Sequence, residues 1–158
     1  MASIISVDDI IEKTSGHGVQ IPGHVVQVVY GTSVADNNST STSFVASDLS
    51  ASITPSSTSS KILVQLGLAS WHVASANAYV TVYRDSTNIG NGTYGISMLY
   101  ATSSGTYIPA GAIQVLDSPS STSSLTYKMY FRSHGGGSTY VSYSTYGIAT
   151  ITLMEIAQ

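Results

Sequence analysis

The feature that most constrains the fold is a period of two in the hydrophobic pattern. Residues 125–131 alternate strictly, so that one face of an extended chain would collect apolar side chains and the other more polar ones: Leu125, Tyr127, Met129 and Phe131 against Thr126, Lys128 and Tyr130. This alternation is typical of a half-buried antiparallel strand. Residues 62–68 and 148–156 alternate in the same way, and in 148–156 both faces are predicted to be mostly buried.

Eight or nine strands are predicted on this basis, from nine candidate segments. The clearest are 62–68, 79–84, 125–131 and 148–156, and weaker ones are 24–30, 43–53, 94–100, 107–116 and 138–143. Turn-forming residues dominate the intervals 36–41, 85–92, 103–105, 118–123 and 134–137. Short strands separated by turns every ~8 to 12 residues predict an all-β fold, an antiparallel β-sandwich or jelly roll. The one helical pattern, residues 7–13, is so short that it fits an extended chain equally well.

The small number of charged residues argues against some classes of binding partner. Charged residues make up 8% of the chain, against roughly 25% in an ordinary soluble domain, and Ser and Thr take their place. The net charge is -3 and the 5 Lys and Arg residues are scattered, so nucleic-acid binding is disfavoured. The absence of cysteine excludes disulfides and thiolate chemistry. Residues 62–73 are too short for the roughly 20 residues of a membrane helix, and residues 1–12 do not resemble a signal peptide, so neither membrane insertion nor export by that route is expected.

The N-terminal segment differs in texture from the rest of the chain. We predict an assembly or docking arm over residues 1–23 and a β-sandwich head domain over residues 24–158. A sandwich of ~130 residues fills its core with its own strands, so the apolar side chains of the arm would be exposed on a monomer. Either the arm adds an edge strand to its own sandwich, or it packs against sister subunits or a larger assembly. The residues expected to make these contacts are Ile4, Ile5, Val7, Ile10, Ile11, Val19 and Ile21.

The carboxylates do not form a pattern typical of catalysis. No Gly-x-Ser-x-Gly motif is present, and most Asp residues fall at turns, where Asp commonly bonds its own backbone. Asp85 and Asp117 are interpreted in this way. Glu155 shares a strand face with apolar residues, so we expect it to pair with Lys or Arg or to lie at the open end of the strand. We therefore predict that the protein is not an enzyme.

The histidines do not have the spacing of a zinc site within one chain, so no metal and no cofactor are predicted. In a trimer, three copies of His17 or His24 could still face one shared ion on the symmetry axis.

Tyrosine is abundant, and with Ser, Gly and Asn it makes the composition of an adaptable binding surface. The alternative is that these rings fill the core or a subunit interface, with the hydroxyl at the rim. The residues predicted to contact a receptor, with sugars as the suitable ligand class, are Tyr94, Tyr100, Tyr107, His134, Tyr140, Tyr143 and Tyr146.

Several stretches of the sequence resemble those of a known group of proteins. Residues 7–29 read VDDIIEKTSGHGVQIPGHVVQVV, residues 52–64 read SITPSSTSSKILV, residues 82–90 read VYRDSTNIG and residues 149–156 read ATITLMEI. With the shorter matches at 42–45, 116–119, 126–128 and 131–133, they resemble small structural proteins of tailed bacteriophages, especially phages of cyanobacteria and marine bacteria. The resemblance covers nearly the whole chain.

The resemblance implies a structural role on the virion. Proteins of this group are described as tail-fibre tips, head fibres or capsid-decorating proteins, and many have trimeric heads similar to tumour-necrosis-factor-like jelly rolls. The expected protein is thus a non-enzymatic virion component, a homotrimer that contacts other capsid or tail proteins and, as a further expectation, host surface glycan. A stand-alone carbohydrate-binding module is the alternative function.

Overall fold

The computed structural model describes residues 21–68, 72–73, 77–99, 111–142 and 147–158. Every regular element in this part of the chain is a β-strand, and none of it forms a helix that could cross a membrane. The strands are β1 (Val25–Ser33), β2 (Asn37–Ser39), β3 (Val45–Ile53), β4 (Lys61–Leu68), β5 (His72–Val73), β6 (Asn77–Arg84), β7 (Thr87–Asn88), β8 (Ser97–Leu99), β9 (Gly111–Asp117), β10 (Leu125–His134), β11 (Thr139–Ser142) and β12 (Ala149–Ile156). The prediction of an all-β antiparallel sandwich is confirmed. The helix candidate at 7–13 and nearly all of the proposed arm lie outside the described residues.

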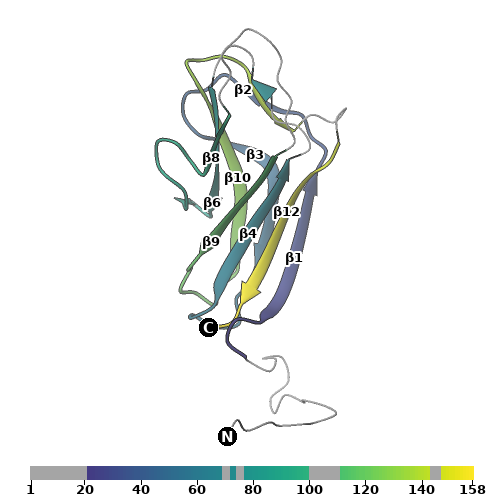
Figure 1. Cartoon of the computed structure of the whole chain (residues 1–158), viewed down its shortest axis with the longest axis vertical. Coiled ribbons are helices and arrows are strands. Elements are labelled where there is room, and N and C mark those ends of the chain that lie inside the picture. Colours follow the sequence, from purple (N-terminus) through teal and green to yellow (C-terminus); the bar gives the residue numbers. More distant parts are fainter. Residues whose placement is uncertain (1–20, 69–71, 74–76, 100–110, 143–146) are drawn as a thin grey trace, which may run out of the picture.

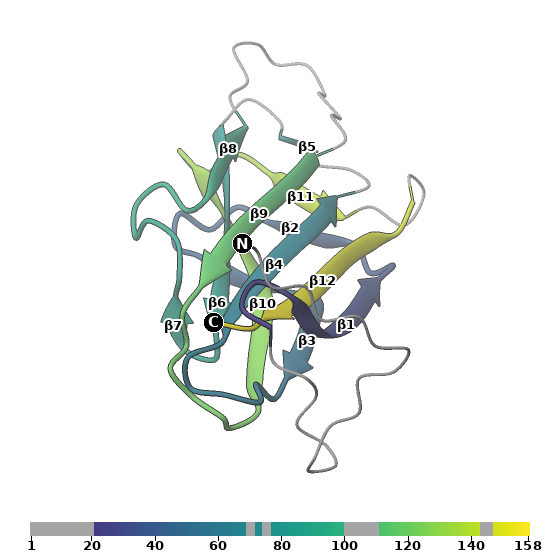
Figure 2. The same cartoon turned by 60° about the horizontal axis from the view of Figure 1, so that its bottom comes forward.

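Two antiparallel sheets pack against each other (Figure 1). The first sheet has the strand order β1-β12-β4-β9, and Figure 2 shows these four strands side by side. The second sheet has the order β3-β10-β6, with β7 and β8 both paired to the free edge of β6. A small third sheet, β2-β11-β5, lies at one end of the molecule.

The hydrophobic alternation explains why these strands form a sandwich. Along β10 every second residue from Leu125 to Ser133 is buried, and β4 and β12 show the same alternation. The inward side chains of both sheets form one continuous core, to which the largest contributions come from Tyr127, Phe131, Leu49, Ile62, Leu66, Met129, Ile151 and Leu153. Full burial of one such side chain contributes about 1.5–3 kcal/mol, so the core is the main source of stability.

Each of the nine predicted segments contains a strand in the described part of the chain, while the predicted strand residues 100, 107–110 and 143 lie outside it. Two short strands lie where turns were predicted: β2 within 36–41 and β7 within 85–92. Both are held by backbone pairing and by asparagine rather than by apolar side chains. Asn37 in β2 is buried and donates to the hydroxyl of Ser142 in β11 at 3.0 Å, while its side-chain oxygen accepts from the backbone N–H of Asp48. Such strands carry no hydrophobic alternation, which is why the sequence pattern missed them.

The prediction that both faces of 148–156 are mostly buried is wrong for one face. Ala149, Ile151, Leu153 and Glu155 are buried, whereas the alternate residues Thr150, Thr152, Met154 and Ile156 remain partly exposed on the outside of the first sheet. No part of the described chain covers that outer surface. The exposed apolar side chains on this surface make it a candidate for contact with another molecule.

Candidate functional site

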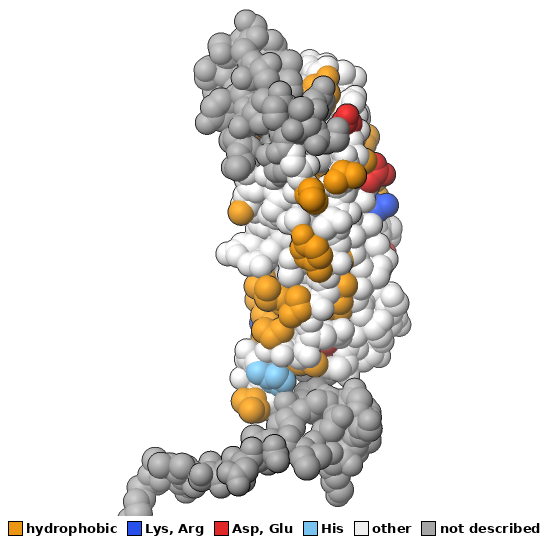
Figure 3. All heavy atoms as spheres, turned by 90° about the vertical axis from the view of Figure 1, so that its right-hand side faces the viewer, with side chains coloured by type: hydrophobic (Ala, Val, Ile, Leu, Met, Phe, Trp, Pro, Cys, Tyr) orange, Lys and Arg blue, Asp and Glu red, His pale blue; other side chains and the backbone are white. Residues whose placement is uncertain are grey.

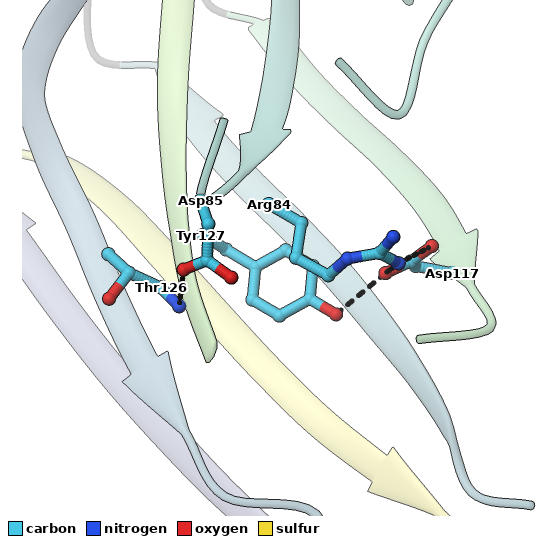
Figure 4. A network of polar contacts seen from close by, with 5 residues as sticks. All are labelled: Arg84, Asp85, Asp117, Thr126 and Tyr127. Carbon is cyan, nitrogen blue, oxygen red and sulfur yellow. Dashed lines mark hydrogen bonds and ion pairs between the residues drawn. The ribbon is translucent and has the colours of Figure 1, made fainter. Parts of the chain in front are cut away.

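The carboxylate of Asp117 joins the two sheets of the sandwich (Figure 4). Asp117 ends β9 in the first sheet and forms an ion pair at 2.7 Å with Arg84 of β6 in the second sheet. It also accepts a hydrogen bond at 2.7 Å from the hydroxyl of Tyr127 in β10. Burial and the hydrogen bond to Asp117 both raise the pKa of Tyr127, so this hydroxyl stays protonated. The interpretation of Asp117 as a turn residue is wrong, because its carboxylate bridges the sheets.

Asp85 does occupy a turn, as predicted. It follows β6 with a φ of 52°, the left-handed conformation that a tight hairpin requires, and Asp tolerates it better than most residues. Its side chain accepts a hydrogen bond at 2.9 Å from the backbone N–H of Thr126 (Figure 4). The carboxylate fixes the hairpin to β10.

Glu155 is fully buried and has no cationic partner among the described residues, so the expectation of a Lys or Arg partner is wrong. One carboxylate oxygen accepts from the backbone N–H and hydroxyl of Ser56, at 2.8 and 2.6 Å, and from the hydroxyl of Ser60 at 2.6 Å. The other oxygen accepts from the side-chain amide of Gln27 at 2.6 Å. Burial alone would raise the pKa of Glu155, but these hydrogen bonds together outweigh burial and hold the pKa below its ordinary value. The residue fastens β1, β12 and the connection between β3 and β4 to one another.

The outer face of the first sheet consists of the side chains of β1, β12, β4 and β9 that point away from the core. The strand register aligns these side chains in rows across all four strands. One row is entirely apolar: Val28, Met154, Leu63 and Leu116. The next two rows, both on one side of the apolar row, are uncharged: first Tyr30, Thr152, Gln65 and Gln114, then Thr32, Thr150, Gly67 and Ala112. On the other side of the apolar row, Ile156 is paired with Lys61. Lys61, at the start of β4, is the one charged residue on this face of the described strands.

Much of this face is open to solvent. Val28 is 57% exposed and Leu116 is 51% exposed, at opposite edges of the apolar row. Figure 3, which looks at the β1 side of the molecule, shows hydrophobic side chains in a broken column, with a few charged side chains at the upper right. The row of small residues leaves a shallow hollow of about 540 Å³ beside Gly67 and Ala112, so the face also has relief that a partner could fill. A large uncharged sheet face of this kind is suited to protein association.

Two of the predicted receptor contacts lie next to one shared ring, that of Tyr79. Tyr94 is 60% exposed, and its ring lies 5.8 Å from the ring of Tyr79, while the ring of His134 lies 5.9 Å from that same Tyr79 ring. Tyr140 is half-buried on β11 of the third sheet. The other predicted contacts, Tyr100, Tyr107, Tyr143 and Tyr146, lie outside the described residues.

Of the predicted arm residues, Ile21 is described and is 55% exposed. The remaining six, Ile4, Ile5, Val7, Ile10, Ile11 and Val19, lie outside the described residues. Close to Ile21, the backbone N–H of Gly23 donates to the carbonyl of Ala157 at 2.8 Å, and the N–H of Ala157 donates to the carbonyl of His24 at 3.0 Å. The chain is thus tied to the end of β12 at the predicted boundary between arm and head.

The outer surface of the second sheet holds a groove that the sequence analysis did not anticipate. It measures about 440 Å³ and is lined by Thr42, Ser43, Phe44, Tyr83, Gly92, Thr93 and Arg132. We call it the Arg132 groove. The signal that could have indicated part of it is the alternation of β10, which places Arg132 on the same face as Lys128 and Tyr130. Its other walls come from segments distant in sequence, so no local pattern predicts them.

Histidine and carboxylate side chains do not cluster in the described part of the chain: no three of them could hold a metal ion together. His24, one of the two histidines considered for a shared ion, accepts a hydrogen bond through Nδ1 from the backbone N–H of Ile21 at 3.0 Å. His17 lies outside the described residues. Comparison of the chain with protein-family models finds no match, and comparison with curated proteins finds no similar sequence.

Proposed function

We propose that this protein is a non-enzymatic structural component of a tailed-phage virion, a capsid decoration, head fibre or tail-fibre part, that works as a homotrimer. The observation that carries the proposal is the outer face of the first sheet, with an apolar row across four strands and a single charge. Monomeric soluble proteins rarely expose a large apolar face, whereas the subunits of a symmetric assembly bury such a face against one another. The resemblance of the sequence to phage structural proteins supports placing that assembly on the virion.

The order of the strands supports the jelly-roll interpretation. The eight main strands in chain order are β1, β3, β4, β6, β8, β9, β10 and β12. In these terms the first sheet has the order 1-8-3-6 and the second sheet has the order 2-7-4-5. This interleaving of early and late strands is what two Greek keys wrapped into a double sheet produce. Trimeric heads of this architecture are what the sequence resemblance implies, and this is why we propose three subunits rather than two.

The first prediction concerns the mass of the purified protein. Light scattering at micromolar concentration is expected to give three times the 16.5 kDa of the chain. The mass is expected to stay the same when salt is raised, because an interface with so little charge depends on apolar and hydroxyl contacts that salt does not screen. A monomer would overturn the proposed assembly, and a dimer would contradict the trimer while leaving the fold intact. Mass spectrometry of purified phage particles tests the virion assignment separately.

The second prediction concerns the arm. Removal of residues 1–23 is expected to leave a soluble, folded β head that no longer joins the particle, because the head keeps its own core while the apolar side chains of the arm are lost. Circular dichroism of the truncated protein and its incorporation into particles are the measurements. Failure to fold would make the arm an internal part of the sandwich. Normal incorporation would show that docking resides on the head.

A stand-alone carbohydrate-binding module is a second candidate function, and the Arg132 groove is the observation that favours it. The two functions are compatible, because the groove lies on the second sheet and the proposed association face lies on the first. An assembly formed through the first sheet would leave the groove open on the outside of each subunit.

A further inference from the structure

The Arg132 groove combines segments that only the fold brings together. Thr42, Ser43 and Phe44 precede β3, Tyr83 comes from β6, and Arg132 comes from β10. Gly92 and Thr93, from the turn between β7 and β8, complete the wall. Its volume of about 440 Å³ falls in the ordinary range of small-ligand sites, which is roughly 300–1,000 Å³.

Arg132 is held in place by the groove itself. Its guanidinium donates to the backbone carbonyl of Thr42 at 3.0 Å and to the carbonyl of Thr93. It also lies over the ring of Tyr79, 4.4 Å from the centroid, and 5.4 Å from the centroid of Phe44. A guanidinium fixed in this way loses little further conformational freedom when it binds a ligand.

The charge of Arg132 is not neutralised by these contacts. Its partners are carbonyl groups and aromatic rings, whereas the ion pair in the described part of the chain belongs to Arg84 and Asp117. A guanidinium has five N–H donors, so three donors remain unused after it has bonded to the two carbonyls. The groove therefore offers one positive charge and unused hydrogen-bond donors, which fit an anionic group that can accept two parallel bonds.

The rest of the groove favours a sugar ring beside that anion. Tyr83 stacks on Tyr130 with a centroid distance of 4.0 Å and an angle of 25° between the rings, which makes a rigid aromatic platform. Aromatic rings pack against the apolar face of a ligand, and the hydroxyls of Thr42, Ser43 and Thr93 supply donors and acceptors around it. Hydroxyl-rich walls with an aromatic platform match the chemistry of a pyranose, which has an apolar face and a polar rim.

We propose that the Arg132 groove binds a carboxylated sugar unit of a polysaccharide, with the carboxylate on Arg132 and the sugar ring against Tyr83. One guanidinium matches the single charge of a carboxylate, whereas a phosphate with close to two charges would call for a second cation that the lining lacks. This inference rests on the second candidate function, carbohydrate binding, and deepens it by naming the sugar class. Its test uses binding by the isolated protein, so its failure would leave the tests of assembly and virion location untouched.

The test compares binding of trigalacturonate and of its methyl ester, which has the same rings without the charge, by calorimetry. We expect binding of the acid and at least about tenfold weaker binding of the ester, the ratio that loss of one charge-assisted hydrogen-bond pair gives. Arg132→Gln is expected to weaken binding of the acid by about 10- to 100-fold. Lys61→Gln is the matched control, because it removes one positive charge from the first sheet while the groove lies on the second, and it is expected to bind as the unchanged protein does.

A second variant separates loss of binding from loss of the fold. A Cβ atom added at Gly92 meets no atom within 4 Å, and Gly92 lines the groove, so Gly92→Leu is expected to fold normally and to narrow the groove while Arg132 stays intact. Thermal unfolding checks that its stability is unchanged. The proposal is overturned if the acid does not bind, if the ester binds equally well, if Gly92→Leu binds normally, or if Lys61→Gln weakens binding as much as Arg132→Gln. Equal binding of an acidic peptide or of a sugar phosphate would also overturn it.

Discussion

Met154→Lys is expected to convert the proposed trimer into folded monomers. Met154 lies on β12 in the middle of the apolar row, between Val28 of β1 and Leu63 of β4. In a symmetric assembly through this face, each interface would have to accept a buried lysine, and like charges brought together cost several kcal/mol. The dissociation constant is expected to rise by at least about 100-fold, which light scattering over a range of protein concentrations measures.

The fold of the single subunit is expected to survive this change. Met154 points away from the core, and the aliphatic part of a lysine side chain can cover the same sheet surface with its charge in water. Met98→Lys is the matched control, since Met98 is 50% exposed on β8 of the second sheet and the change is identical. A trimer that persists in Met154→Lys would show that association uses another surface. Equal dissociation of Met98→Lys would show that any added charge disrupts the assembly.

The fold class could be predicted from the sequence because buried and exposed residues alternate along each strand of a sandwich. One side of β10 faces the other sheet and the opposite side faces solvent. Residues on the buried side are therefore mostly apolar, and residues on the solvent side are more polar. β2 and β7 escaped prediction because asparagine, serine and threonine give the same signal in a short paired strand as in a turn. The rows on the outer face of the first sheet depend on register between strands, and register is not visible in any one segment.

The polar sites were less predictable for a related reason. A carboxylate near a strand end can pair with a cation, bind hydroxyls or bond its own turn, and the sequence does not say which donors will be close. Asp117 has Arg84 within reach because β9 and β6 lie in different sheets that meet at one end of the sandwich. Glu155 instead faces a serine-rich connection. The Arg132 groove needs four separate segments, so only the assembled fold reveals it.

Glu155→Ala is expected to destabilise the subunit by about 2–4 kcal/mol, because the change leaves several buried donors without an acceptor. The donors are the backbone N–H of Ser56, the hydroxyls of Ser56 and Ser60, and the amide of Gln27. Glu155→Gln is expected to destabilise by about 1–2 kcal/mol, since an amide oxygen can accept in place of one carboxylate oxygen while the amide NH₂ opposes Gln27. Asp48→Asn, at an exposed carboxylate on β3, is the control and is expected to change stability by less than about 0.5 kcal/mol. Urea unfolding at one fixed protein concentration measures all three variants, because association makes apparent stability depend on concentration.

The effect of Glu155→Gln is expected to depend on pH in a definite direction. Hydrogen bonds hold the pKa of Glu155 in the folded protein below the ordinary value of 4.5, so the folded state binds the proton more weakly than the unfolded chain does. The stability that the ionised carboxylate contributes is therefore complete above pH 4.5 and is lost as the pH falls through the folded pKa. The difference in unfolding free energy between the unchanged protein and Glu155→Gln should be constant from neutral pH to about pH 5.5 and should shrink steadily in more acidic solution. A difference that stays constant in acid would mean that folding leaves the pKa of Glu155 unchanged, and one that grows would mean that folding raises it. Either result would contradict the hydrogen bonds assigned to the carboxylate.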